Sequence, residues 1–245
     1  MIIAGLQKST LIDFPGRIAC TVFTLGCNFR CPFCHNKDLL NQELFKKSKI
    51  KSIEEKDFFD FLNKRKKILD GVCITGGEPS LNKDLKSFCG KIKSLGLEIK
   101  LDTNGTNPLV LKNLIKKKLI DFVAMDIKAS FNNYSRAAGV KFPLKKIKES
   151  IRIILKSGLE YELRTTIVPG IHSQKEVVRM ALDLKKITQE FNKDKSLVYI
   201  LQSFQPQNCF DPHYLKIKPN SLKKDKKILK LVKQVLPKTK LRRDD

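Results

Sequence analysis

The chain has 245 residues, and its 49 lysines and arginines outnumber 25 aspartates and glutamates to give a formal net charge of +24 at pH 7. Its longest apolar stretches fall far short of the roughly 20 residues that a membrane span needs, so no membrane partner is expected. The first residues show no basic segment followed by a long apolar one, which predicts a chain without a secretory leader and a cytoplasmic location.

The excess of positive charge is mostly lysine, in runs such as residues 63–67, 116–118 and 223–227. A surface of this charge attracts polyanions or an acidic partner protein. The runs fall on the polar sides of predicted helices, and no aromatic residues are interleaved with them as stacking platforms for bases. We interpret the runs as solvated helix faces, with nucleic-acid binding as the alternative.

Short β-rich runs alternate with helical patterns along the whole chain. The predicted strands are Ile18–Leu25, Val72–Thr75, Leu97–Leu101, Phe122–Ile127, Tyr161–Val168 and Leu197–Leu201. Apolar spacing predicts helices around residues 58–69, 81–95, 111–115, 147–155, 177–187 and 222–235. This alternation is typical of a parallel sheet with right-handed crossovers. We predict an α/β fold, a partial (β/α)6 TIM-like barrel, with a doubly wound sheet as the alternative.

No internal repeat and no linker rich in Pro, Gly or Ser divides the sequence. We therefore predict a single domain over residues 1–235. Residues 236–245 carry several basic side chains and no helical pattern, so we expect a flexible basic C-terminal tail there.

The unusual polar residues close predicted strands or come directly after them. In a parallel barrel these positions share one rim, where active sites are built, and the pattern therefore indicates an enzyme. The segments, in strand order, are the cysteines from Cys27, Gly76-Gly77-Glu78-Pro79, Asp102-Thr103-Asn104-Gly105, Asp126-Ile127-Lys128, Arg164 with Pro169-Gly170, and residues 202–206.

Three of the seven cysteines, Cys27, Cys31 and Cys34, have the spacing C-x3-C-x2-C. Thiolates are the usual ligands of iron–sulfur clusters, and three of them leave one iron open for another molecule. The alternative is a zinc site completed by His35, although zinc sites usually pair their ligands as two C-x2–4-C units. Cys20, Cys73 and Cys89 are expected to be buried as small apolar residues, and Cys209 is undecided.

The cysteine spacing, with Phe33 before the third cysteine, resembles the radical S-adenosylmethionine (SAM) superfamily. Segments 9–16, 23–28 and 34–36 resemble glycyl-radical-enzyme activating enzymes, first those of anaerobic ribonucleotide reductase and next those of pyruvate formate-lyase. The resemblance extends from about Gly5 to Gln205. It implies one [4Fe–4S] cluster on Cys27, Cys31 and Cys34 that binds SAM at its open iron.

The resemblance also implies roles for the later segments. It places His35 and Asn36 at the adenine and counts the aromatic Phe33 among the cofactor-binding residues. It places Gly76, Gly77 and Glu78 at the amino group of SAM, and Asp102 and Asn104 near the ligand. Asp126 and Lys128 share one face of a strand end, and with Arg164 they are the expected catalytic residues. Ordinary turns at 76–79 and 102–105, and a plain salt bridge at 126–128, are the alternatives.

One departure from the resemblance is informative. Activating enzymes of pyruvate formate-lyase carry a histidine after the sixth strand, whereas residues 201–206 contain none. Gln202 could hydrogen-bond a sugar or adenine but cannot titrate near neutral pH. This favours the ribonucleotide-reductase type. No further cysteine set lies between Cys34 and Cys73, so a single cluster is expected.

The sequence therefore predicts a radical enzyme that acts on a glycyl radical enzyme, with anaerobic ribonucleotide reductase as the expected partner and flavodoxin or ferredoxin as the electron donor. One alternative is a radical SAM enzyme acting on a small molecule or RNA, for example a deazaguanine synthase. Another is an iron–sulfur or zinc regulator that binds nucleic acid through its basic surface.

Overall fold

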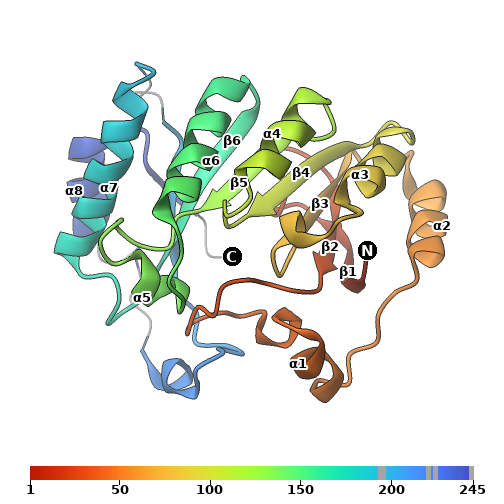
Figure 1. Ribbon diagram of the computed structural model, residues 1–245, viewed down its shortest axis with the longest axis horizontal. Coiled ribbons are helices and arrows are strands. Elements are labelled where there is room, and N and C mark those ends of the chain that lie inside the picture. Colours follow the sequence, from red (N-terminus) through yellow and green to blue (C-terminus); the bar gives the residue numbers. More distant parts are fainter. Residues whose placement is uncertain (193–196, 219–221, 223–225, 243–245) are drawn as a thin grey trace. The chain divides into compact units, whose positions relative to one another are not determined.

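A computed structural model describes residues 1–192, 197–218, 222 and 226–242, and Figure 1 follows the chain through its helices and strands. The strand order is β1-β2-β3-β4-β5-β6-β7-β8. The chain divides into two compact units. The first unit holds residues 1–28 and 36–124, and the second holds residues 29–35 and 125–245.

The first unit begins with an antiparallel pair, β1 (Ile3–Thr10) and β2 (Ala19–Thr24). Parallel strands β3 (Gly71–Gly76) and β4 (Glu98–Thr103) follow, and then the start of β5 (Phe122–Asp126). Apolar stripes pack the longer helices on this unit; for example, the rings of Phe58 and Phe88 stack with centroids 5.4 Å apart. The helices are α1 (Gln42–Lys47), α2 (Glu55–Arg65), α3 (Leu85–Lys93) and α4 (Pro108–Lys116), with short 3-10 turns at Lys37–Leu39 and Pro79–Leu81.

The second unit contains the end of β5 and the parallel strands β6 (Glu160–Ile167), β7 (Tyr199–Ser203) and β8 (Lys240–Leu241). Its longer helices have clear ends: Gly158 closes α6 in the left-handed conformation, and Ser173 caps α7 by accepting a hydrogen bond from Glu176 N. The helices are α5 (Tyr134–Ala138), α6 (Leu144–Ser157), α7 (Gln174–Gln189) and α8 (Lys226–Val235), with a 3-10 turn at Pro212–Lys216.

The α/β fold class with a mostly parallel sheet is confirmed, and all six predicted strands are present. Two further strands, β1 and β8, were not predicted, because their sequences show little of the pattern that indicates a strand. The outer half of β1 is the exposed polar run Gln7-Lys8-Ser9, which shows no apolar alternation. Strand β8 is only two residues long.

Strand β8 lies inside the segment that the sequence predicted to be a flexible tail. Its Lys240 and Leu241 pair with Ile200 and Leu201 of β7. Leu236 and Thr239 before it are buried. Residues 236–242 therefore have defined contacts in the second unit, whereas residues 243–245 lie outside the described part of the chain.

The described residues also bear on two further predictions from the sequence, the burial of three cysteines and the exposure of the lysine runs. Cys20, Cys73 and Cys89 are buried, as predicted. Lys116, Lys117 and Lys118 are exposed, as expected for a solvated helix end. Much of the run at 223–227 lies outside the described residues. No helix in the described part of the chain is long and apolar enough to cross a membrane.

Candidate active site

The loop Phe29–His35 carries the second and third cysteines, and the second unit holds it at several points. Arg30 N donates to Ala138 O (2.8 Å), and the backbone N–H of Asp211 donates to Pro32 O (2.8 Å). Cys34 N donates to Cys31 O (3.0 Å), which folds the loop into a tight turn. A Cβ on Gly139 would overlap the Arg30 carbonyl, so this residue must be glycine for the loop to lie close to α5.

Aromatic rings fix the same loop from its sides. The ring of Phe33 meets His172 and Tyr214 at centroid distances of 6.4 and 6.5 Å. His35 lies 6.0 Å from the Phe204 ring, and burial lowers its pKa although a hydrogen bond to the Gln205 backbone opposes the change. Phe33 is buried against protein groups, whereas His35 is exposed, and the predicted contact of His35 with adenine stays a prediction.

In the first unit, the turn Gly76-Gly77-Glu78 lies against the backbone that leads to Cys27. Gly77 N donates to Thr24 O (2.9 Å) and Glu78 N donates to Gly26 O (2.7 Å). A Cβ on Gly76 or Gly77 would overlap backbone atoms of Thr24 or Gly26. The two glycines therefore allow a close approach of the turn to the loop before Cys27.

Glu78 has partners that differ from the expected amino group. It is fully buried, and its carboxylate accepts from Ser80 N (3.1 Å), the Ser80 hydroxyl, Thr103 Oγ1 (2.8 Å) and Asn104 N (2.6 Å). Burial raises the pKa of Glu78, and the four hydrogen bonds act against that rise. In this structure Glu78 joins the loops that follow β3 and β4.

Asparagine side chains surround the first cysteine within the first unit. Asn104 Nδ2 donates to Asn28 Oδ1 (2.9 Å) and lies 4.0 Å from Cys27 Sγ. Asn28 Nδ2 donates in turn to Thr106 Oγ1 (2.9 Å). Asn36, which follows the third cysteine, donates to Gly76 O (3.1 Å). The amide groups thus connect the strand-end loops with the residues that flank the cysteine motif.

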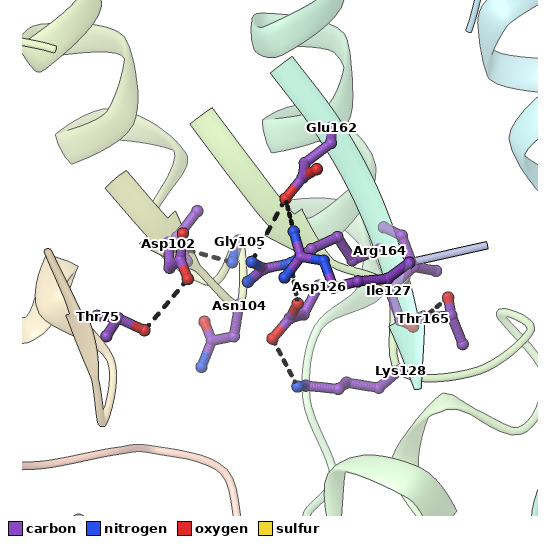
Figure 2. A network of polar contacts seen from close by, with 12 residues as sticks. Thr75, Asp102, Asn104, Gly105, Asp126, Ile127, Lys128, Glu162, Arg164 and Thr165 are labelled. Carbon is purple, nitrogen blue, oxygen red and sulfur yellow. Dashed lines mark hydrogen bonds and ion pairs between the residues drawn. The ribbon is translucent and has the colours of Figure 1, made fainter. Parts of the chain in front are cut away.

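Asp102 forms an ion pair that the sequence analysis did not anticipate. Its partner is Lys100, whose side chain is fully buried, and Thr75 Oγ1 donates to the other carboxylate oxygen (3.2 Å; Figure 2). Lys100 Nζ also lies 3.7 Å from Cys73 Sγ. Residues two apart on a strand share a face, so the pairing of 100 with 102 was available from the sequence in the same way as that of 126 with 128.

A group of charged side chains in the second unit lies at the end of β5. Figure 2 shows Asp126 between two cations: Arg164 Nε donates to its Oδ1 (3.0 Å) and Lys128 Nζ to its Oδ2 (3.0 Å). Burial alone would raise the pKa of Asp126, but Arg164 and Lys128 hold it well below its usual range. The pKa of Lys128 is raised by Asp126 and by Cys31, against its burial. The three predicted catalytic residues are thus brought together.

This group has an excess of positive charge. Arg164 also contacts Glu162 Oε1 (3.5 Å), which accepts from Arg242 as well (2.7 Å). Asp126 and Glu162 thus share three cations, and the formal sum is +1. The side chain of Asp126 remains 35% exposed, so the group is accessible to a small molecule. Because of its excess positive charge, this group of side chains can bind an anion such as a carboxylate. Gln202 lies half-buried on β7.

A model of the radical SAM superfamily matches residues 21–184, which is well over half of the chain. The chain belongs to the radical SAM superfamily. A relative from Methanocaldococcus jannaschii, assigned by its name as a glycyl-radical enzyme activating enzyme, is 32% identical over 238 residues, covering 94% of this chain and 92% of the relative.

Two further similarities agree with membership of the superfamily. The pyruvate formate-lyase-activating enzyme of Clostridium pasteurianum is 28% identical over 250 residues, 96% of this radical SAM chain and 98% of that enzyme. The crystal structure of Streptococcus suis SuiB bound to S-adenosylmethionine has a TM-score of 0.62 at 14% identity, over 89% of this chain and 48% of SuiB, which is a likeness of fold. The chain is therefore a radical SAM enzyme of the glycyl-radical-enzyme activating kind.

Radical SAM enzymes use a [4Fe–4S] cluster and S-adenosylmethionine. The donor chemistry of this chain fits such a cluster, since three thiols lie within eight residues and no disulfide joins any of the seven cysteines, all of which are described. Among the described residues, no three His, Cys, Asp or Glu side chains are already grouped as ligands of one metal ion. The fit therefore rests on the ligand type and the spacing.

The motif at residues 9–16, which carries part of the resemblance to activating enzymes, has a structural role in the first unit. Thr10 Oγ1 accepts from Asp13 N (3.3 Å), and Asp13 accepts from Thr21 Oγ1 (2.7 Å). Phe14 is fully buried against Phe122. The motif joins β1 to the start of β2, whereas Cys27 follows the end of β2, so its side chains shape a hairpin at the far end of that strand from the first cysteine.

Proposed function

We propose that this radical SAM enzyme generates a glycyl radical on an anaerobic ribonucleotide reductase, with Cys27, Cys31 and Cys34 as the ligands of its cluster. The observation that carries the proposal is the position of the charged strand end within the second unit. The carbonyl of Lys128, whose ammonium group pairs with Asp126, accepts a hydrogen bond from the His172 ring (2.8 Å), and this ring meets Phe33 of the cysteine loop at a centroid distance of 6.4 Å. A cation and the cluster-forming loop therefore lie close together.

The residues of this group would bind and orient the ligand. Lys128 and Arg164 present positive charge beside the partly exposed Asp126, which suits an amino acid carboxylate held next to a cation. When bound, the cluster and SAM supply the electron and the primary carbon radical that removes hydrogen from the target glycine. The enclosed aromatic residues around Cys31 and Cys34 would keep water from the reacting centre.

The proposed partner rests on Gln202, which stands on β7 where the pyruvate formate-lyase type would carry a histidine. The high positive charge favours an acidic electron donor, for which flavodoxin or ferredoxin is the proposal. Seven cysteines without a disulfide fit a reducing, cytoplasmic compartment.

The test uses anaerobically reconstituted protein, a reductant, SAM and the co-occurring reductase. Release of 5′-deoxyadenosine with a doublet in the electron paramagnetic resonance spectrum of the reductase is expected. Cys31→Ala should lose the cluster and both products, whereas Cys89→Ala, a buried cysteine on α3, should keep them. Release of 5′-deoxyadenosine without a reductase radical would show that the partner is a different protein. Full cluster content in Cys31→Ala would refute the ligand assignment.

A further inference from the structure

Three buried side chains of the second unit donate to three successive carbonyl groups at the end of β5. Thr165 Oγ1 donates to Ile127 O (2.8 Å; Figure 2), and Tyr134 Oη donates to Asp126 O (3.4 Å). The ring of His172 bonds to Lys128 O (2.8 Å). The strand itself ends at Asp126, and although Ile127 N still donates to Arg164 O (2.7 Å), these side chains satisfy the three carbonyl groups.

The hydrogen bonds of His172 define its protonation state. Val168 N donates to Nδ1 (2.9 Å), so Nδ1 must be an acceptor without a proton. Nε2 then carries the proton, because its partner is a carbonyl oxygen, which can only accept. His172 is 4% exposed, and both ring nitrogens of this neutral imidazole are used. The ring therefore ties the backbone at Val168 to that at Lys128.

A turn and a helix cap fix the position of His172. Its backbone N–H donates to Val168 O (2.9 Å) around the Val168-Pro169-Gly170 turn, where Gly170 has a φ of 84°. The next residue, Ser173, caps α7. On its other side, the imidazole meets the ring of Phe33 edge-on at 6.4 Å and 73°. Phe33 lies between Cys31 and Cys34, so His172 contacts both the charged strand end and the cysteine loop.

We propose that His172 is a positioning residue that holds Lys128 and the Cys31–Cys34 loop in place for the reaction. The inference rests on the proposed function, because that function gives Lys128 its role. His172 has no role in the sequence-based prediction, and its contact with Lys128 spans 44 positions of the chain.

Two substitutions separate the hydrogen bonds of the ring. In His172→Gln the side-chain amide can reach the position of Nε2 and still donate to Lys128 O. In His172→Asn the amide oxygen can replace Nδ1 as acceptor for Val168 N, but the side chain is too short to reach Lys128. A purely structural residue would be affected similarly by both changes. A positioning role through Lys128 predicts that glycyl radical formation is about fivefold slower in His172→Asn than in His172→Gln. A change of this size corresponds to the loss of one hydrogen bond.

The same comparison in a Lys128→Ala background tests whether the effect passes through Lys128. The difference between Gln and Asn should vanish there, because coupled residues are not additive. His213, an exposed residue of the turn Pro212–Lys216, provides the control, and His213→Asn should leave the rate unchanged. Equal rates for the Gln and Asn variants, or a difference that persists without Lys128, would overturn the proposal.

A second measurement uses the cluster-free protein and does not depend on activity. Iodoacetamide should alkylate Cys31 and Cys34 about fivefold faster in His172→Asn than in the unmodified protein, because the loop opens more often. Cys27 lies in the first unit and serves as the internal reference. Unchanged alkylation would refute the effect on the loop. If the unmodified protein forms no glycyl radical, the proposed function fails, while the alkylation result still decides whether His172 holds the loop.

Discussion

Glu78 and Asp126 are both carboxylates that follow a strand, but the protein holds them in opposite ways. Glu78 is fully buried among neutral donors, and burial raises its pKa. Asp126 keeps 35% of its side chain exposed and lies between two cations that lower its pKa. The first arrangement favours a carboxyl group that resists ionisation, whereas the second favours a permanent charge.

The difference indicates a division of labour between the two regions. Around Glu78, close backbone approach and hydrogen bonds from uncharged groups define the shape of the loops beside Cys27. Around Asp126, the excess positive charge of Lys128 and Arg164 provides a place for an anionic ligand. Changes in the first region should therefore affect stability and cluster retention, and changes in the second should affect chemistry.

The largest expected effect is that of Gly77→Ala. Its Cβ would overlap the carbonyl of Gly26, a backbone atom that cannot move aside without displacing the loop before Cys27. We expect a loss of about 3 kcal/mol in the free energy of unfolding, measured by urea denaturation. Gly90→Ala on α3 is the matched control, since nothing lies within 4 Å of its added Cβ. An equal loss in both variants would contradict the shape argument for the turn.

Lys128→Ala should have the next largest effect, which we expect on activity and not on stability. Removal of a charged group that orients the reacting centre should reduce glycyl radical formation on the order of 10²-fold, measured from the doublet in the electron paramagnetic resonance spectrum. Cluster absorbance should be retained. Lys116→Ala, at an exposed helix end, is the control. A loss of only a few-fold would mean that Lys128 merely pairs with Asp126.

The pH dependence of stability should separate the two carboxylates by sign. The folded protein holds the proton of Glu78 more tightly than the unfolded chain does, so the contribution of Glu78 to stability falls as the pH rises above its ordinary pKa of 4.5. Asp126 has a lowered pKa, so its contribution is present above 3.8 and is lost as the pH falls below that value.

The measurement for this prediction is urea denaturation of the unmodified protein and Glu78→Gln at about pH 4.5, 5.5 and 7. The stability of the unmodified protein relative to the variant should decline across the series. A difference that stays constant with pH would show that Glu78 is ionised throughout, like Asp126.

The smallest effect is expected for substitutions in the lysine runs, which include neither of the two carboxylates. Replacing Lys116, Lys117 and Lys118 by Gln should change the free energy of unfolding by less than about 0.5 kcal/mol. Fluorescence anisotropy should show only non-specific nucleic-acid binding, with a Kd of roughly 10⁻⁴–10⁻⁶ M that weakens steeply with salt. A selective nanomolar RNA complex would instead favour the RNA-modifying alternative.

Patterns between near neighbours in the sequence determined much of this protein. Alternating strand and helix periods gave the α/β class and the six strands of the parallel sheet. The spacing of Cys27, Cys31 and Cys34 pointed to a cluster, and the two-residue spacing of Asp126 and Lys128 predicted that both point the same way at the strand end, where they form an ion pair. These properties depend on the backbone period, which the side chains of a short segment are enough to set.

The tertiary structure alone decided which distant groups meet. Glu78 accepts from Asn104, 26 positions away, and is buried in a hydrogen-bonded network that joins two loops. His172 reaches Lys128 across 44 positions, and Lys100 is buried beside Cys73 and Asp102. Such partners depend on the alignment of neighbouring strands and on the turns that follow them, which no local period specifies, because burial and pairing are properties of the packed chain.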